Sequence, residues 1–341
     1  MSNLDWIVLI FTLVSIVTYG IWKTRGAKDL QTYLKGNNDA KWWGIGISIM
    51  ATQASAITFL STPGQAYTDG MRFIQFYFGL PIAMIILSVT FLPIFYKLKV
   101  YTAYEYLETR FDLKTRTLAA FLFLIQRGLA AGITIYAPSI ILSTLLGWNL
   151  NWTNIFIGSL VILYTVSGGT KAVTQTQKQQ MAVMMGGMIL AGIIVVNMLP
   201  KEISFIDALH IAGKMEKLNL INFDFDLNDR YNFWTGTTAA LFLFLSYFGT
   251  DQSQVQRYLT GKSLSQSRLG LMMNGLLKIP MQFIILFIGV MVFVFYQFNT
   301  PPVFFNKVEL NKVKQSSYYS NIKLLEENFE TLHSKRAVDL F

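Results

Sequence analysis

The middle of one long apolar run, residues 49–58, reads IMATQASAIT. The run extends from Trp42 to Gly64, which is long enough for a membrane helix, yet its centre holds small and hydroxylated residues where Leu and Ile would be usual. Two interpretations stay open. Small residues allow a second helix to approach closely, and hydroxyls can satisfy carbonyls that are freed where a helix unwinds. In the second case the unwound carbonyls can coordinate a cation.

Seven further apolar runs surround this one. A helix rises about 1.5 Å per residue and the hydrocarbon core of a bilayer is about 30 Å thick, so each run predicts a membrane span or nearly one. A composition of 53% hydrophobic and 14% charged residues agrees. The chain is therefore predicted to be an all-α polytopic membrane protein with eight spans. The seven runs are Leu4–Trp22, Phe73–Tyr96, Leu118–Leu146, Trp152–Gly168, Gln180–Leu199, Phe233–Gly249 and Leu269–Phe298.

Lys and Arg residues predict the orientation. They gather in the short loops after spans one, three, five and seven, and they are nearly absent from the short loops on the other side. By the positive-inside rule, the four basic loops are cytoplasmic and the N-terminus is outside. We expect a multi-pass protein of the plasma (inner) membrane whose partner is the lipid bilayer. The net charge of +9 reflects this topology and predicts no nucleic-acid partner.

Several kinds of chemistry are excluded by what the sequence lacks. The chain has no Cys, and its two His residues, His210 and His333, fall in predicted outer loops. We found no phosphate-binding glycine loop, catalytic carboxylate pair or nucleophile–base arrangement. The sequence therefore predicts that the protein is not an enzyme, and it predicts no cofactor and no metal besides a coupling sodium ion.

The seventh span has a polar interruption that matches the one in span two. After an apolar stretch comes SYFGTDQ, residues 246–252. Paired interruptions in two distant spans are typical of inverted-repeat transporters with a binding site near the membrane midplane. We therefore expect two helix breaks, one near Gln53–Ala56 and one near Tyr247–Gly249.

Two cations lie inside predicted spans. Arg127 is in span four and Lys278 in span eight, about equally deep. A cation at the membrane centre costs about 2.5–3.5 kcal/mol on insertion scales, so such residues mark transport pathways or buried ion pairs. A snorkelling side chain or a structural ion pair is the alternative for each, and Asp251 can pair with either cation.

Four groups of residues, in order along the chain, resemble the sodium:solute symporter family. The resemblance is closest to the branch that carries iodide, monocarboxylates and vitamins. The matching residues are Ala54–Leu60 with Pro63–Gly70, Phe91–Tyr96 with Thr102–Phe111, Tyr136–Pro138 with Tyr164–Val173, and Thr250–Gln252 with Val255–Leu259 and Leu277–Ile279.

The resemblance implies a fold similar to that of the leucine transporter, with two inverted five-helix repeats after one extra helix. Residues 1–298 are then the transmembrane domain. Within it, 1–41 hold the extra helix and a cytoplasmic loop, 42–200 the first repeat, and 232–298 the first two helices of the second repeat. Residues 299–341 form an external polar loop or tail. The last core helices of the family are expected to be missing.

The resemblance also assigns roles to residues. The carbonyls of Ala51 and Ala54 match the family's sodium site, and Lys278 matches a solute-site position. Thr58 and Tyr77 stand where the glucose branch has sugar ligands, which disfavours a hexose. Gln53, Thr58, Tyr77, Tyr247 and Lys278 are our candidate solute ligands. Gln177 stands where the family usually has Asp, and we assign Arg127, Gln177 and Asp251 gating or structural roles.

The predicted function is sodium-coupled symport of a small solute, an organic or inorganic anion. Two alternatives stay open. The chain can be a truncated fragment that transports nothing, because helices that complete the family's sodium site are not found after Phe298. The same fold can also serve as a membrane sensor module, which would require a signalling domain.

Overall fold

The computed structural model describes residues 3–24, 39–55, 57–226 and 228–338, and these residues form an all-helical bundle. Within these ranges the only β-type pairing is an isolated bridge between Ala40 and Gly261. The first half of the chain contains α1 (Asn3–Thr24), α3 (Trp42–Gln53), η2 (Ile57–Ser61), α4 (Thr62–Asp69), η3 (Met71–Tyr77), α5 (Gly79–Val89), α6 (Phe91–Leu98), α7 (Glu105–Arg110) and α8 (Leu113–Leu146). The second half contains α9 (Leu150–Asn197), α10 (Phe205–Lys214), α11 (Phe233–Thr237), α12 (Ala239–Thr250), α13 (Gln252–Leu259), α14 (Leu264–Phe298), α15 (Lys307–Lys314) and α16 (Tyr319–Val338).

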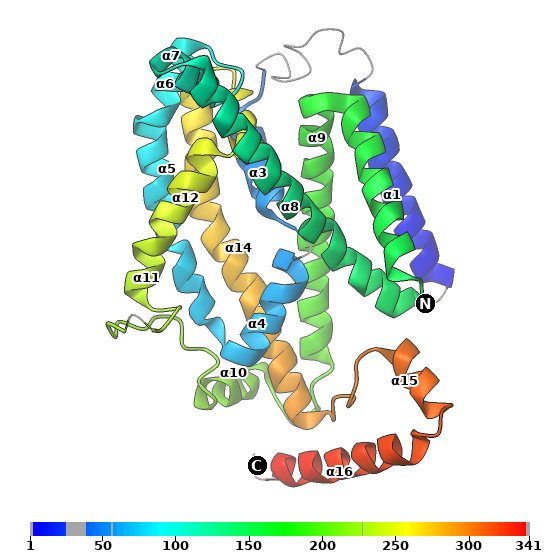
Figure 1. The fold of residues 1–341 in the computed structure, drawn as a ribbon. Helices are drawn as coiled ribbons and strands as arrows, with labels where there is room; N and C mark the ends of the chain where they lie inside the picture. Colours follow the sequence, from blue (N-terminus) through cyan, green and yellow to red (C-terminus); the bar gives the residue numbers. More distant parts are fainter. Residues whose placement is uncertain (1–2, 25–38, 56, 227, 339–341) are drawn as a thin grey trace.

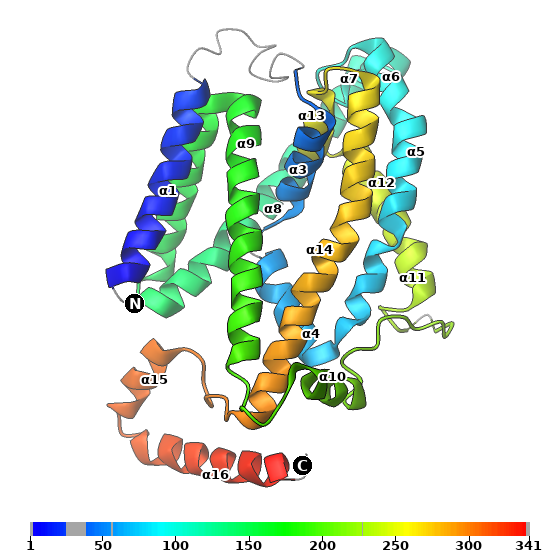
Figure 2. The same ribbon diagram turned by 180° about the vertical axis from the view of Figure 1, so that it is seen from behind.

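The long helices run alternately up and down between two ends of the molecule (Figure 1). α9 contains two arms that run in opposite directions, so the chain reverses between Leu163 and Val173 (Figures 1 and 2). These two arms correspond to the predicted spans five and six. α1 packs along one of the arms, on the side away from α14 (Figure 2). α7 lies at one end of the bundle, and α10, α15 and α16 lie at the other.

Length and apolar composition identify several membrane spans. In the described residues, four helical stretches are long and apolar enough to cross a bilayer, and the bent pair of Trp42–Gln53 and Ile57–Asp69 is a fifth candidate. Asn3–Ile16 and Leu150–Leu163 are shorter apolar helices. The predicted span seven is divided between α11 and α12. The protein is thus an all-helical membrane protein, and the number of eight crossings stays a prediction.

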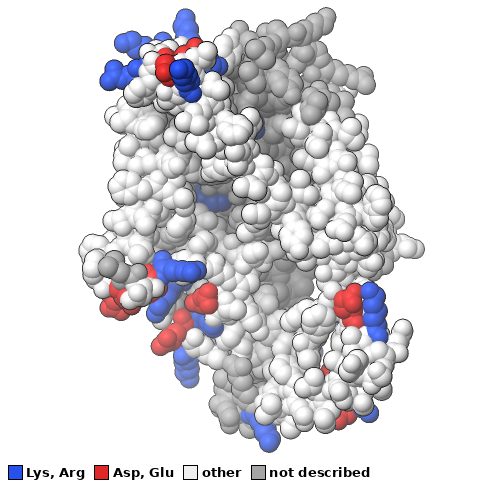
Figure 3. Space-filling model, viewed as in Figure 1, with Lys and Arg blue, Asp and Glu red and all other residues white. Residues whose placement is uncertain are grey.

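The surface agrees with a membrane location. Charged side chains gather at the two ends of the face shown in Figure 3, and the band between them is almost entirely uncharged. The end that carries α6 and α7 is rich in Lys and Arg on this face. It is the end that the positive-inside rule predicts to be cytoplasmic.

The core forms around α14, which packs against α3, α4, α5 and α9. Small residues let these backbones approach closely. Gly270 faces the side chain of Ile45 in α3, and Gly289 faces the backbone of Pro63 in α4. A cluster rich in Met joins α3, α9 and α14, and the unbranched thioethers suit an irregular space between three helices. It includes Met50, Met181, Met188, Met281 and Ile285.

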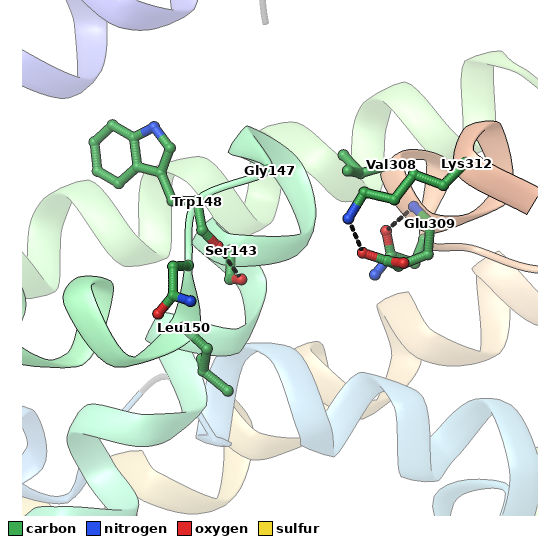
Figure 4. Close-up of a pocket in the computed structure, with 9 residues that line it drawn as sticks. Ser143, Gly147, Trp148, Leu150, Val308, Glu309 and Lys312 are labelled. Atoms are coloured by element: carbon green, nitrogen blue, oxygen red, sulfur yellow. Dashed lines mark hydrogen bonds and ion pairs between the residues drawn. The ribbon is translucent and has the colours of Figure 1, made fainter.

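The α8–α9 turn and α15 meet around a polar hollow of about 370 Å³ (Figure 4). Gly147 ends α8 with a positive φ of 72°, and a Cβ at this glycine would lie 3.5 Å from the side chain of Val308. Within α15, Lys312 Nζ lies 2.7 Å from Glu309 Oε1. The contact between Gly147 and Val308 places α15 beside the turn that joins the predicted spans four and five.

Candidate functional site

The helix of span two is broken where its small and hydroxylated residues lie. α3 ends at Gln53, and Ala54 has an extended backbone with φ −82° and ψ 95°. The chain becomes helical again as a short π-helix at Ile57, and the two halves of the span meet at 71°. Pro63 in the first turn of α4 suits a helix start, where its missing N–H costs no hydrogen bond. The predicted break is confirmed at Gln53–Ser55, and Ala56 lies outside the described residues.

Ala51 and Ala54, our candidate sodium ligands, lie at this break. The Ala54 N–H donates to the carbonyls of Met50 and Ala51, each at 3.1 Å. A carbonyl oxygen has two lone pairs, so the Ala51 oxygen keeps capacity for a second partner. Both alanines belong to the Met-rich cluster or pack against it. Among the described residues no group of three His, Cys, Asp or Glu side chains is placed to hold a metal ion. A cation at this break would therefore depend on backbone and hydroxyl oxygens.

A cavity of about 290 Å³ lies beside the break. Its lining comes from α3, η3, α12 and α14, and it brings together four of our five candidate solute ligands. The lining residues are Gln53, Tyr77, Leu243, Phe244, Tyr247 and Lys278.

Lys278 is the only charged residue of this lining, and it is 1% exposed. Its Nζ has no hydrogen-bond partner among the described residues and lies 5.9 Å from the centre of the Tyr77 ring. A buried ammonium without a carboxylate is costly unless something supplies the missing negative charge. The burial of this side chain is inconsistent with snorkelling, and no ion pair of Lys278 is found among the described residues.

Two amides orient the uncharged groups around the cavity. Gln53 Nε2 donates to Asn274 Oδ1 at 3.2 Å, and Gln254 Nε2 donates to the Tyr247 hydroxyl at 2.8 Å. These bonds tie α3 to α14 and the end of α12 to α13. Because the Tyr247 hydroxyl accepts from Gln254, its own proton remains available for a solute acceptor.

Thr58 lies outside this lining. Its hydroxyl donates to the Gln53 carbonyl at 3.3 Å, across the break. This is the local role expected of a hydroxyl at an interrupted helix. In the described structure Thr58 therefore supports the break, and its assignment as a solute ligand stays a prediction.

The predicted break at Tyr247–Gly249 is wrong. α12 is helical from Ala239 to Thr250, and the irregular positions are Thr238 and Asp251. The physical reason is packing. Phe248 is fully buried, and a Cβ at Gly249 would lie only 3.0 Å from Leu87. This glycine permits close approach between helices, and the buried side chains around it hold the helix together.

Arg127 and Asp251 form a pair away from the cavity lining. Their Nη1 and Oδ2 atoms are 3.6 Å apart, and Arg127 also donates to the hydroxyl of Ser253. The Asp251 carboxylate caps α13 by accepting from Ser253 N at 2.8 Å. Of the two cations that Asp251 was expected to pair with, it selects Arg127. The pair joins α8 to the start of α13, and its structural or gating role stays a prediction.

Gln177 joins α9 to α3. Ser48 Oγ donates to Gln177 Oε1 at 2.7 Å, and Gln177 Nε2 donates to Thr52 Oγ1 at 2.9 Å. Both partners lie in the half-helix that ends at the break. An amide can serve both hydroxyls because it donates and accepts, whereas an ionised Asp only accepts.

Sequence reasoning missed two buried amides of α14. Asn274 and Gln282 are fully buried, and neither the oxygen nor the nitrogen of the Gln282 amide has a partner among the described residues. They stand four residues before and four after Lys278, so all three lie on one face of the helix. The four-residue spacing of these amides from Lys278 within an apolar run is the sequence signal that could have identified them.

The profile of the sodium:solute symporter family matches residues 33–325, which is most of the chain. The chain belongs to this family. It is 32% identical over 274 residues to sodium-coupled monocarboxylate transporter 1 of Xenopus laevis, covering 79% of this chain and 44% of the relative. It is 31% identical over 301 residues to the human sodium/iodide cotransporter, covering 85% of this chain and 46% of the relative. This chain thus spans less than half the length of these relatives.

A solved structure of a Na⁺-coupled sialic acid symporter, in a substrate-bound outward-open state, is also similar. The TM-score is 0.82 at 26% identity, and the match covers 89% of this chain and 64% of that one. This chain therefore has the leucine-transporter-like fold that the resemblance implied, and it belongs to a family of transporters, not of enzymes.

Proposed function

We propose that this chain forms the solute site of a sodium-coupled symporter for a small anion. The observation that carries the proposal is Lys278, a buried ammonium without a described partner in the wall of a cavity beside a broken helix. An anion in this cavity supplies the missing charge in a site of low dielectric, where such pairing is strongest.

The rest of the lining favours a compact solute. Leu243 and Phe244 provide apolar contact, and the rings of Tyr77 and Tyr247 provide a surface on which a small anion can stack or accept a hydrogen bond. The relatives named above carry monocarboxylates or iodide according to their names, and both are small anions. We assign Gln53 an uncharged hydrogen bond to the same solute.

Sodium is proposed to bind at the carbonyls of Ala51 and Ala54. Hard cations prefer oxygen ligands, and a broken helix offers carbonyls without adding charge. Gln53 lies between the two alanines and also lines the cavity. Ion and solute therefore contact the same short segment, which provides a short route for coupling between them.

The helix directions and the distribution of charge support the remaining assignments. Residues 42–200 form the proposed first repeat, and α11 with α14 and the helices between them begin the second. The Lys- and Arg-rich end is proposed to face the cytoplasm across the plasma membrane, with the N-terminus outside. The Arg127–Asp251 pair is proposed to hold α8 against α13 while the inner side is closed.

The test is sodium-dependent uptake of labelled iodide and short monocarboxylates in cells that express the complete reading frame. Lys278→Met keeps the side-chain bulk and removes the charge, and uptake should fall roughly 10–150-fold, since a hydrogen bond to a charged group contributes about 1.5–3 kcal/mol. Lys278→Arg should retain part of the uptake. The matched control is Lys262→Met, at an exposed lysine outside the cavity.

Ala54→Phe tests the sodium half separately. It should abolish the sodium dependence while surface expression is unchanged, because the bulky ring displaces the carbonyls at the break. Normal anion uptake by Lys278→Met, or unchanged sodium affinity in Ala54→Phe, would refute the corresponding half of the proposal.

A further inference from the structure

A second cavity, about 490 Å³ and predominantly apolar, lies at the Lys- and Arg-rich end of the bundle. Helices α6, α7 and α8 and the end of α12 form its walls. Phe91, Ile94, Leu107, Leu122 and Phe123 are among its lining residues. None of its lining residues belongs to the solute cavity, so the two are separate features of the molecule.

The outer wall of this cavity faces the surroundings of the bundle. On α8, the lining residue Leu122 is 56% exposed, and its neighbours Phe121 and Leu124, which do not line the cavity, are 59% and 66% exposed. Large apolar side chains exposed to this extent on a membrane-spanning helix are suited to contact with lipid tails. The cavity can therefore be entered sideways from the bilayer by an acyl chain.

Basic residues stand at the rim of the same cavity. Each of the three wall helices carries an exposed cation at the end nearest the loops. On α6 and α7 the cation stands three residues from a lining residue, a spacing that shares a helix face, and on α8 it lies in the first turn, eight residues before a lining residue. The three pairs are Lys97 with Ile94, Arg110 with Leu107, and Lys114 with Leu122.

The acidic side chains described near these three cations have other partners. Lys97, Arg110 and Lys114 have no ion pair among the described residues. The acidic residues nearby are already used. Glu105 and Glu108 pair with Arg116, and Asp112 accepts from the backbone N–H of Thr115 at 2.7 Å. In the described part of the chain, the loop ends of the wall helices therefore present positive charge without an acidic partner, next to an apolar cavity.

We propose that this cavity binds an anionic phospholipid, with an acyl chain between α6 and α8 and the phosphate at Lys97, Arg110 and Lys114. Basic residues beside a hydrophobic space at the cytoplasmic end of membrane helices are the recognised chemistry of such sites. An apolar peptide or a neutral sterol would fill the cavity but leave the cations unpaired. Because Gly249 and Thr250 at the end of α12 also line the cavity, the lipid would contact the helix that carries Tyr247.

The test uses the purified full chain in detergent, with bound lipid measured by native mass spectrometry and thermal stability. Phosphatidylglycerol should be retained, and should stabilise the protein, more than phosphatidylcholine with the same chains. Lys97→Gln with Lys114→Gln should weaken phosphatidylglycerol binding by roughly 10–30-fold, since each basic residue near an anionic headgroup contributes about 1 kcal/mol. The matched control is Lys41→Gln with Lys262→Gln, which removes the same charge from exposed lysines outside the cavity.

A second pair of variants tests the acyl-chain part. Ala119→Phe fills the cavity and should reduce the binding of both lipids, whereas Ala131→Phe, at an exposed position on the same helix, should not. Free glycerophosphate should not reproduce the stabilisation. Equal binding of the two lipids to the unaltered chain, an equal effect of the two lysine double variants, or full stabilisation by glycerophosphate alone would overturn the proposal.

Discussion

The contact between α14 and α4 gives a sharp prediction for Gly289→Ala. A Cβ at Gly289 would lie 2.1 Å from the Pro63 carbonyl oxygen and 2.7 Å from its carbonyl carbon. These are backbone atoms in the first turn of α4, so they cannot rotate away as a flexible side chain can. To admit the methyl group, α4 and α14 must separate, and α4 is the half of span two that follows the break.

The magnitude follows from two opposing terms. Overpacking a core costs about 1–3 kcal/mol, and a clash with fixed backbone belongs at the upper end of that range. Replacing a helical Gly by Ala returns about 1 kcal/mol. We therefore expect Gly289→Ala to destabilise the protein by about 2 kcal/mol. Gly132 is the control, because nothing lies within 4 Å of the position that an alanine methyl group would take there, and Gly132→Ala should be neutral or stabilising by up to about 1 kcal/mol.

The assay is denaturant or thermal unfolding of the purified protein in detergent, with both variants compared with the unaltered chain. The difference between the two alanine variants should be about 3 kcal/mol, because the gain from replacing a helical Gly by Ala is common to both and only the overpacking cost at Gly289 remains. If Gly289→Ala is as stable as Gly132→Ala, α4 and α14 are not in backbone contact, and the reasoning about how the broken helix is held is wrong.

Three further predictions concern polar contacts. Arg127→Gln should destabilise the protein by about 1–3 kcal/mol, which is less than the loss of a fully buried ion pair would cost, because Arg127 is a third exposed. In a double-mutant cycle measured by unfolding, Asp251→Asn should remove most of that penalty. Gln177→Leu leaves two hydroxyls of α3 without an amide partner and should lower the free energy of unfolding by about 1–3 kcal/mol, whereas Gln177→Glu should lower it less. Equal losses of stability in the two variants would contradict the double hydrogen bond. Hydrogen bonds from Ser204 lower the pKa of Asp207, so α10 should gain stability above the ordinary carboxyl pKa and lose it as the pH falls through the lowered value. Hydrogen exchange of α10 at several pH values measures this loss, which Ser204→Ala should reduce.

Much of the fold was predictable because membrane helices are specified locally. A segment in lipid must satisfy its own backbone hydrogen bonds, so an apolar run of sufficient length indicates a helix without knowledge of its neighbours. The break in span two was equally local, since IMATQASAIT lacks the large apolar side chains of an ordinary span. The interruption in span seven was not of the same kind. SYFGTDQ includes Phe248 and Gly249, and the role of this glycine is set by Leu87 and Phe91 on different helices.

The candidate site was predictable in part for the same reason. A buried cation such as Lys278 is recognisable in any apolar run, because its cost is known before its partners are. Asn274 and Gln282 were missed because an uncharged amide within a span is a weaker signal than a charge, and their importance depends on their position relative to Lys278. Thr58 has the side chain of a solute ligand, but its hydroxyl bonds to the Gln53 carbonyl across the break.

By itself the sequence determined the membrane class, the order of the apolar runs, the break at Gln53–Ser55 and the presence of two cations inside spans. Each of these depends on the cost of placing a residue in lipid, which is a property of the residue and its immediate neighbours. Only the tertiary structure decided which cation is paired. Arg127 meets Asp251 and Ser253, whereas Lys278 faces a cavity with Gln53, Tyr77 and Tyr247. That difference arises from contacts between residues far apart in the sequence, which packing of the helices brings together and local pattern does not encode.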